Sequence, residues 1–239
     1  MSHHGTEKRG PATASWLKGT NHKFYEDRFR LLSETIPLVS KSGRGSLYAV
    51  FDGIGGAPEG MRAAQHMADK LLKFYQDPEC YPDTAYGLHR LLDEGNRDIH
   101  LWGVIDGTDR PLGGCAGTIA WVHGNKLHAF HAGDTVGFLI RAGRAISLTR
   151  QHEKNGAIYR YFGLGPNLKI DSCRLTLEDG DRILLFSDGV TKVMHPATAA
   201  DAVCESDNIA EAATRLVRLS RLKGSPDDIT VLITHVDVD

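Results

Sequence analysis

The order of the predicted strands and helices constrains the fold of this chain more than any other feature of its sequence. Apolar and β-branched runs predict one strand region, then two consecutive helices, five or six strands, two more helices and a last strand. This order differs from the alternation of strand and helix that builds a doubly wound parallel sheet. It favours antiparallel sheets packed together, with helices covering their outer faces.

Short apolar or alternating runs with turn signals between them predict the strands. Gly124-Asn125 and Ala142-Gly143 each separate two such runs as a two-residue turn. The nearly continuous apolar run Arg182–Ser187 is typical of a strand covered on both faces. We expect strands at Ser46–Asp52, Ala116–His123, Lys126–Ala132, Val136–Arg141, Arg144–Leu148, Arg182–Ser187 and Ile229–Val236, and a weaker one at Arg28–Val39, which Pro37 interrupts.

Apolar residues that recur on one helical face predict the helices. Pro58–Tyr75 and Asp83–Trp102 both show this spacing, and Pro58 suits the first turn of a helix. Two further helices are expected at Pro196–Cys204 and Asn208–Leu222.

Length and composition favour an ordinary globular domain. The chain has 239 residues, of which 41% are hydrophobic, and a chain of this size buries roughly 70–75% of the surface that its unfolded form exposes. No repeat, linker or composition break divides it, so we expect a single domain over residues 16–239. Residues 1–15, with His3, His4 and Pro11 among them, are expected to form a flexible tail.

Charge and cysteine usage exclude several classes of protein. With 28 basic and 30 acidic residues, the net charge of −2 disfavours nucleic-acid binding. The longest run without Asp, Glu, Lys or Arg, Pro111–Asn125, is too short to span a bilayer, and Met1–Lys18 lacks the apolar segment of a secretory signal. The 4 cysteines are scattered and form no CxxC pair, which favours reduced thiols. We therefore expect a cytoplasmic protein without membrane or nucleic-acid partners.

Acidic residues at the ends of predicted strands are the main chemical feature of the sequence. They are Glu26-Asp27, Asp52, Asp134, Asp188 and Asp227-Asp228. Such acids would repel one another if the fold brought them together, unless cations were present. Mg²⁺ and Mn²⁺ prefer carboxylate oxygens and water, so they are the natural partners. Asp-Gly is also a common turn dipeptide, so the hypothesis depends on all of these acids together.

Other chemistries fit the sequence less well. Pro58 stands where a dinucleotide-binding motif needs its third glycine, and no P-loop, EF-hand or GxSxG motif occurs. His128 and His131 would lie on opposite faces of a strand, which disfavours a zinc site with His123. A basic stripe on the last predicted helix is either a solvated face or a docking surface for an acidic partner: Arg215, Arg218 and Arg221.

The strand-end acids and their neighbours resemble the metal-dependent type 2C (PPM) serine/threonine protein phosphatases in their compact bacterial form. The matching segments run in the family's order from about Asn21 to Val236. They are Tyr25–Asp27, Val50–Gly56, Ala132–Thr135, Leu148–His152, Asp179–Gly189 and Asp227–Thr230. The resemblance implies an α+β fold, a four-layer α-β-β-α sandwich in which helix pairs flank two antiparallel sheets.

The resemblance also implies a centre of two Mg²⁺ or Mn²⁺ ions and suggests their ligands. By motif position, Asp52 would bridge the two ions, the Gly53 carbonyl would bind one, and Asp188 and Asp227 would hold the other. Glu26 and Asp27 would act largely through metal-bound waters, and Asp134, with Asp188, would hold a third, weaker ion.

The implied activity is hydrolysis of phosphoserine and phosphothreonine on proteins by a metal-activated water, without a covalent phosphoenzyme. Chelators would then abolish the activity. The candidate catalytic residues are Asp52, Asp188, Asp227 and His22. The implied partner is a phosphorylated protein in signal transduction, the target of a serine/threonine kinase, and the chain is expected to act as a monomer.

Three positions depart from the family's pattern. His22, with Lys23 beside it, stands where the family has an arginine that binds the substrate phosphate. Histidine lacks the bidentate fork of arginine, so we expect weaker phosphate binding or a different phosphate ligand. Ile54 stands where some animal members have a histidine proposed as general acid. Few residues separate Leu148 from Tyr161, so we expect a truncated flap and an open site.

Two other functions stay open at the level of sequence. A weak or inactive relative could serve as a module that binds phosphorylated partners, although the intact set of Asp52, Asp188 and Asp227 argues against loss of metals. A phosphatase acting on small phosphorylated molecules is the other, because an open site permits it.

Overall fold

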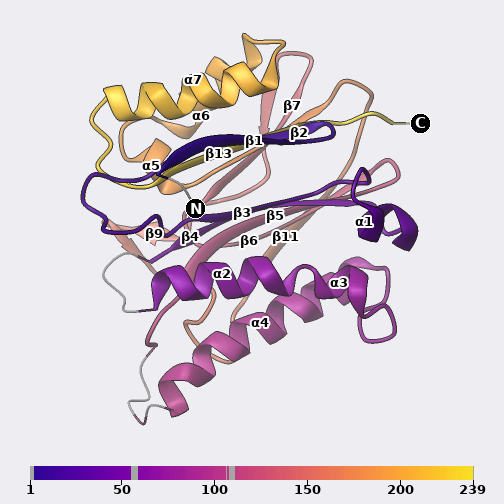
Figure 1. The fold of residues 1–239 in the computed structure, drawn as a ribbon, viewed down its shortest axis with the longest axis vertical. Coiled ribbons are helices and arrows are strands. Elements are labelled where there is room, and N and C mark those ends of the chain that lie inside the picture. Colours follow the sequence, from indigo (N-terminus) through magenta and orange to yellow (C-terminus); the bar gives the residue numbers. More distant parts are fainter. Residues whose placement is uncertain (1–2, 55–58, 106, 108–110, 239) are drawn as a thin grey trace.

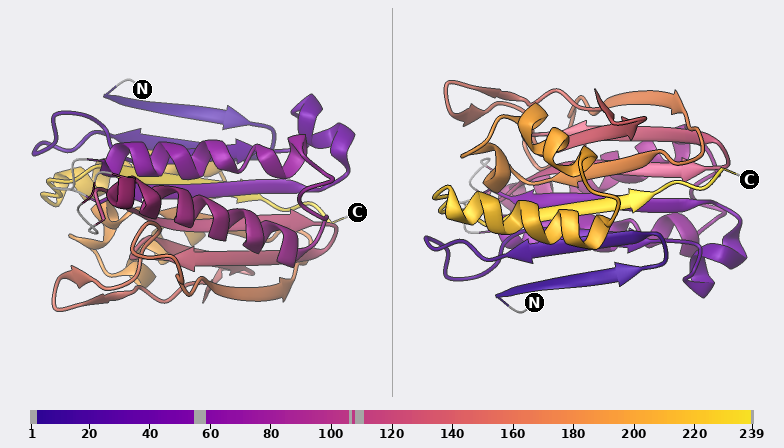
Figure 2. Two further views of the ribbon diagram at one scale, coloured as in Figure 1. Left: turned by 90° about the horizontal axis from the view of Figure 1, so that it is seen from below. Right: turned by 90° about the horizontal axis from the view of Figure 1, so that it is seen from above.

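The computed structural model describes residues 3–54, 59–105, 107 and 111–238, and it shows two antiparallel sheets packed face to face (Figure 1). Helices cover the outer face of each sheet, as the two views of Figure 2 show. The predicted four-layer α-β-β-α sandwich is therefore confirmed.

The larger sheet has six strands in the order β1-β2-β13-β12-β7-β8. They are β1 (His4–Arg9), β2 (Ala12–Leu17), β7 (Val136–Arg141), β8 (Arg144–Ser147), β12 (Arg182–Phe186) and β13 (Ile229–His235). Every residue of the central strand β12 is buried, as its apolar run predicts. Its neighbours β13 and β7 both pair with it in antiparallel register.

The smaller sheet has five strands in the order β11-β6-β5-β4-β3. They are β3 (Arg28–Leu32), β4 (Ser46–Gly53), β5 (Cys115–His123), β6 (Lys126–Ala132) and β11 (Asp171–Thr176). A separate hairpin of two short strands, β9 (Glu153–Lys154) and β10 (Ala157–Ile158), occupies the segment predicted to be a short flap. We call residues 153–158 the flap hairpin.

Three helices lie on the five-stranded sheet and three on the six-stranded sheet. The former are α2 (Gly60–Lys70), α3 (Lys73–Gln76) and α4 (Ala85–Ile105), and the latter are α5 (Asp188–Thr191), α6 (Pro196–Cys204) and α7 (Ile209–Leu222). The Asn208 side chain caps α7 by accepting hydrogen bonds from the amides of Ala210 and Glu211. Among the described helices, none is both long and apolar enough to cross a membrane.

Two predicted elements differ from the structure in their bounds. The helix expected from Pro58 to Tyr75 is divided, because bonds of the i→i−3 type, such as Leu72 to Asp69, tighten the chain between α2 and α3. Pro58 itself lies outside the described residues. The weak strand Arg28–Val39 is only β3, because Pro37 begins the short helix α1 (Pro37–Ser42).

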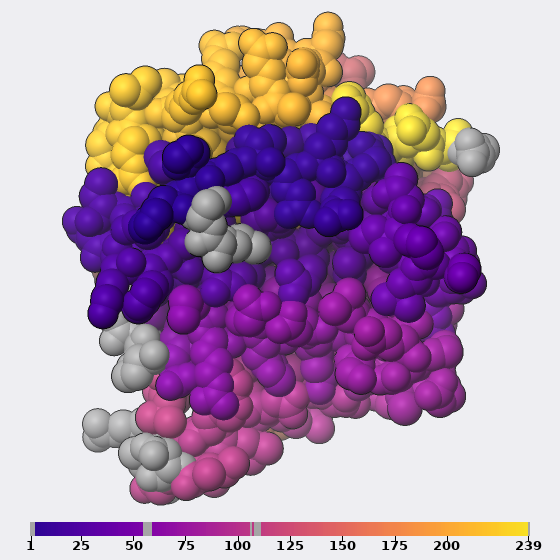
Figure 3. All heavy atoms as spheres, viewed as in Figure 1, coloured from indigo at the N-terminus to yellow at the C-terminus, as the bar shows by residue number. Residues whose placement is uncertain are grey.

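The prediction of a flexible tail over residues 1–15 is wrong for the part that the structure describes. β1 and β2 form a hairpin, and β2 pairs with β13 over its whole length. Ala12 and Ala14 are fully buried between the two sheets, which explains why small side chains occur there. The hairpin (indigo) lies beside α7 (yellow) in Figure 3.

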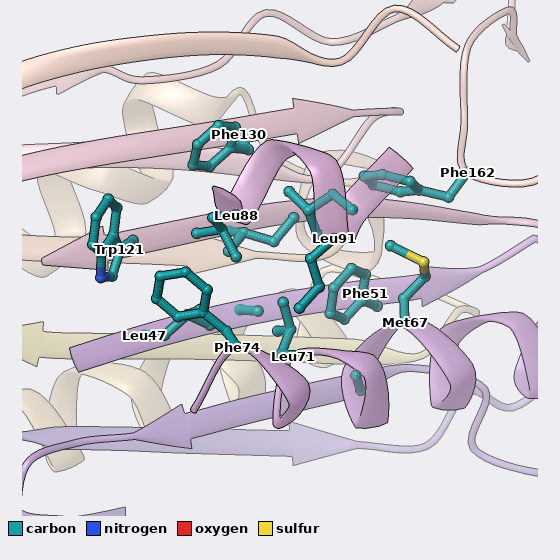
Figure 4. Packing of buried hydrophobic residues seen from close by; sticks show 14 of the residues in the cluster. Leu47, Phe51, Met67, Leu71, Phe74, Leu88, Leu91, Trp121, Phe130 and Phe162 are labelled. Carbon is teal, nitrogen blue, oxygen red and sulfur yellow. The ribbon is translucent and has the colours of Figure 1, made fainter. Parts of the chain in front are cut away.

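The largest part of the core lies between the five-stranded sheet and its helices. Figure 4 shows Phe51 and Leu47 of β4 packed against Met67 of α2, Phe74 of α3 and Leu91 of α4. Two further clusters lie between the sheets and beneath α5–α7. Apolar packing on both faces of each sheet thus holds the ends of β4, β12 and β13 in rigid positions.

Candidate metal centre

A pocket of about 800 Å³ lies where strands of both sheets end, at the side of the molecule labelled α5 and β9 in Figure 1. Its acidic lining comes from the end of β4, the β6–β7 connection, the flap hairpin, the start of α5 and the turn before β13: Asp52, Asp134, Glu153, Asp188 and Asp227. The predicted convergence is therefore present for Asp52, Asp134, Asp188 and Asp227, whereas Glu26 and Asp27 are not among the described residues that line the pocket.

Asp52, Asp134 and Asp188 form the tightest group of acids. Each offers a carboxylate oxygen, and these oxygens lie within 4.8 Å of one another. Burial, followed by the charge of Asp188, raises the pKa of Asp52 well above its usual range. Burial and Asp188 likewise raise the pKa of Asp134 to about 7. Three carboxyl groups at this spacing cannot all be charged at low cost without a cation.

Buried acid oxygens without a hydrogen-bond donor among the described residues provide an independent sign of a missing partner. They are Glu26 Oε2, Asp27 Oδ1, Asp134 Oδ1 and Asp188 Oδ1. Buried acceptors are normally satisfied, and a set of oxygens alone suits a hard divalent ion such as Mg²⁺ or Mn²⁺. The residues of this site therefore fit the metal ions that the sequence implies.

Two glycines let the segments that carry Asp52 and Asp188 pack closely against their neighbours. A Cβ on Gly189 would lie 1.9 Å from the carbonyl oxygen of Asp228, so only glycine lets α5 pack against the turn before β13. A Cβ on Gly53 would lie 2.8 Å from the backbone of Gly60 at the start of α2. In both cases the glycine after the acid serves close packing rather than a turn.

Asp227 lies between two basic side chains. The Nε2 atom of His22 is 3.2 Å from Asp227 Oδ1, and the ammonium of Lys192 contacts Asp227 Oδ2. Lys192 also reaches Asp188 Oδ2, at 2.8 Å. His22 is absent from the described residues that line the pocket, and its Nδ1 atom lies 3.3 Å from Asp228. Its predicted role in phosphate binding stays a prediction.

Asp228, which sequence reasoning does not select as a site residue, organises the segment that contains Glu26 and Asp27. Its two carboxylate oxygens accept hydrogen bonds from the amides of Gly19, at 2.5 Å, and Glu26, at 2.6 Å. Asp27 is as deeply buried as Asp228, with each 1% exposed, and it accepts a hydrogen bond of 2.5 Å from the Thr230 hydroxyl. Burial, followed by the charge of Asp228, raises the pKa of Asp27 well above its usual range.

Asp134 is positioned through its backbone. The Gln151 side chain donates to the carbonyl of Asp134 at 2.8 Å. His152 contacts Gly133 twice, because its Nδ1 accepts from the Gly133 amide at 3.1 Å and its own amide donates to the Gly133 carbonyl at 2.7 Å. Asp171, 3.0 Å from His152 Nε2, fixes the orientation of the imidazole ring.

Sequence reasoning missed Lys192 and Asp228 for different reasons. Lys192 stands four residues after Asp188, a spacing that brings side chains together on a helix and could have indicated the contact. The motif position selects Asp227 for the pocket, but nothing in the sequence indicates that Asp228 binds the amides of Gly19 and Glu26. Of the basic stripe, Arg215 and Arg218 are exposed, whereas Arg221 donates to the carbonyls of Lys18 and Asp227.

Two family models match the chain. One, described as Protein phosphatase 2C, matches residues 17–156, and the other, described as Stage II sporulation protein E (SpoIIE), matches residues 115–237. Between them they include every acid of the pocket.

Curated relatives and solved structures give the same picture. The serine/threonine protein phosphatase PstP of Mycobacterium tuberculosis is 27% identical over 213 residues, which cover 80% of this chain but only 40% of PstP. The protein phosphatase PhpP of Streptococcus pneumoniae is 25% identical over 244 residues, which cover 92% of this chain and 94% of PhpP. The crystal structure of the catalytic domain of PstP in complex with two manganese ions superposes with a TM-score of 0.79 at 25% identity, covering 95% of this chain and 97% of that one.

Proposed function

The chain belongs to the protein phosphatase 2C family, and we propose that it hydrolyses phosphoserine and phosphothreonine on proteins in a reaction that depends on Mn²⁺ or Mg²⁺. The observation that carries this proposal is the group of three pocket carboxylates within 4.8 Å of one another. Buried oxygens without a donor, on Asp134 and Asp188, support it.

We propose that Asp52, Asp188 and Asp227, with the Gly53 carbonyl, hold two divalent ions. Asp134, with Asp188, would hold a third ion. Glu26 and Asp27 would act largely through metal-bound waters. When bound, the ions supply positive charge for the phosphoryl oxygens and make water a stronger nucleophile near neutral pH. The chain's part is to hold the acids at fixed positions on the ends of packed strands, so that little rearrangement is needed.

The rest of the pocket suits a phosphorylated side chain on a protein. Ile54, Ile158 and Tyr161 add apolar surface to the acidic lining, and the flap hairpin is short enough to leave the entrance accessible. We propose that the substrate is the target of a serine/threonine kinase and that the chain acts as a monomer. We also propose a cytoplasmic location, which the four free cysteines support.

The test is an assay with Mn²⁺ on a phosphoserine peptide, a phosphothreonine peptide and p-nitrophenyl phosphate, with Asp188→Ala as the blank. We expect turnover of both peptides, its loss with EDTA, and its recovery with added Mn²⁺. Turnover of p-nitrophenyl phosphate alone would indicate a small-molecule phosphatase instead. Phosphopeptide binding without turnover of any substrate would indicate a binding module.

The role of His22 has its own test. If His22 weakens phosphate binding relative to the family's arginine, His22→Arg should lower KM for the phosphopeptides. An unchanged KM would remove His22 from the catalytic residues.

A further inference from the structure

Lys192 connects two acids that we propose as metal ligands. It follows α5, four residues after Asp188, and its ammonium lies 2.8 Å from Asp188 Oδ2 while also contacting Asp227 Oδ2. The other oxygen of Asp188, Oδ1, is buried and has no donor among the described residues. A single positive group therefore lies between the acids at which a divalent ion would bind.

Lys192 is the only basic side chain among the described residues that line the pocket. Its charge offsets those of Asp188 and Asp227 when no metal ion is present, since carboxylates this close otherwise repel one another. Lys192 contacts one oxygen of each acid, Asp188 Oδ2 and Asp227 Oδ2. A divalent ion held by Asp188 and Asp227 would therefore draw on the same two carboxylates as the ammonium does.

Lys192 is also free to leave. Its side chain is 41% exposed, whereas those of Asp188 and Asp227 are 16% exposed. A lysine side chain has four rotatable carbons and a strongly hydrated head, so it can turn into solvent without disturbing the backbone. The acids themselves cannot move in this way, because the elements that carry them are packed against the core.

We propose that Lys192 is a built-in competitor of the divalent ion, pairing with Asp188 and Asp227 in the metal-free protein and leaving them when the ion binds. This inference rests on the proposed metal centre and adds to it a control on metal occupancy. Because the competitor is part of the chain, its effective concentration at the site is high and fixed. The protein therefore binds Mn²⁺ more weakly than its carboxylates alone would, and the centre fills only when the supply of metal ions is sufficient.

The main test is calorimetric titration of the full chain with Mn²⁺. Lys192→Met keeps the side-chain length and removes the charge, and we expect it to bind Mn²⁺ about tenfold more tightly than the wild type. Lys192→Arg keeps a charge and should stay within about threefold of the wild type. Lys70→Met is the matched control, because Lys70 of α2 forms the same kind of pair with Asp98 of α4, at 2.8 Å, and neither residue lines the pocket.

Thermal unfolding gives a second measurement that does not depend on activity. In EDTA, Lys192→Met should unfold at a lower temperature than the wild type, because its acids have lost their counter-ion, and Mn²⁺ should raise its unfolding temperature by a larger interval. A Lys192→Met affinity for Mn²⁺ that equals or falls below that of the wild type would overturn the inference.

The phosphopeptide assay on the same preparations separates the two proposals. Hydrolysis by the wild type with an unchanged Mn²⁺ affinity in Lys192→Met would retain the phosphatase and reject the competitor. Tighter Mn²⁺ binding by Lys192→Met without hydrolysis by any variant would retain the competitor and reject the phosphatase. Absence of Mn²⁺ binding in every variant would reject both.

Discussion

The two sides of the acidic pocket hold their carboxylates in opposite ways. On the side of β13, the carboxylate of Asp228 accepts hydrogen bonds from the amides of Gly19 and Glu26, so this side chain fixes the position of the backbone around it. On the side of the flap hairpin, Gln151 and His152 form hydrogen bonds with the backbone of Asp134 and Gly133, so the fixed backbone positions the Asp134 side chain.

This difference separates acids that serve the fold from acids available for a ligand. Both oxygens of Asp228 are used by donors of the chain. Asp134 and Asp188 each keep a buried oxygen without a donor among the described residues. Asp228, whose two oxygens accept from backbone amides, stabilises the structure, whereas the unused oxygens of Asp134 and Asp188 are available to a metal ion.

Removing an acid with an unused oxygen should have the largest effect on activity. Asp188→Asn is expected to lower kcat/KM for phosphopeptides by about 10³-fold, because it removes a proposed metal ligand. Its free energy of unfolding in EDTA should stay equal or rise, because one of the repelling charges is gone. Activity within tenfold of the wild type would contradict the division of the acids into these two groups.

Removing the satisfied acid should instead affect stability. Asp228→Ala leaves the amides of Gly19 and Glu26 without their acceptors, at a cost of about 2–3 kcal/mol in the free energy of unfolding measured with urea. Asp179→Ala, at an exposed acid, is the control and should change stability by less than about 0.5 kcal/mol. Equal effects of the two variants would show that Asp228 does not organise this segment.

The flap side can be weakened without touching an acid. His152→Ala removes the acceptor of the Gly133 amide and should lower the affinity for Mn²⁺ about tenfold, as loss of a group that orients a ligand does. His152→Asn, whose amide oxygen can accept the same bond, should restore part of the affinity in a calorimetric titration. If both variants bind as the wild type does, His152 does not position Asp134.

The smallest effect concerns the pH dependence of the metal-free protein. The pKa of Asp134 is about 7 in the folded state and about 3.9 in an unfolded chain. The folded state therefore binds the proton more tightly, and its stability falls as the pH rises from about 4 through 7.

Asp134→Asn should make this fall smaller by about 1 kcal/mol between pH 5 and pH 6, measured by urea unfolding in EDTA. The wild type in excess Mn²⁺ should show the opposite trend, because metal binding requires the deprotonated acid. Parallel pH profiles of wild type and variant in EDTA would contradict the raised pKa.

The architecture and the acids were predictable because both depend on local patterns. Apolar runs such as Arg182–Ser187 identify buried strands. An acid that follows such a run lies where the strand leaves the sheet. The role of the glycine after such an acid could not be predicted from the sequence. Gly189 packs closely against the backbone of Asp228, and this contact depends on the tertiary fold.

The N-terminal hairpin and the partners of the acids were not predictable in this way. Ala12–Leu17 contains small and hydroxyl side chains, and its strand character depends on pairing with β13, more than two hundred residues later in the chain. The bonds from Asp228 to Gly19 and Glu26 also span that sequence distance. Such partners can be found only when the fold is known.

The origin of Asp52 and Asp188 in different sheets has a consequence for handling the protein. Asp52 lies near the end of β4 in the five-stranded sheet, and Asp188 follows β12 of the six-stranded sheet. A ligand shared by them would connect the two sheets of the sandwich. Its binding would therefore stabilise the packing of one sheet against the other. Chelating buffers during purification should therefore make the chain more susceptible to proteases, even where its secondary structure is unchanged.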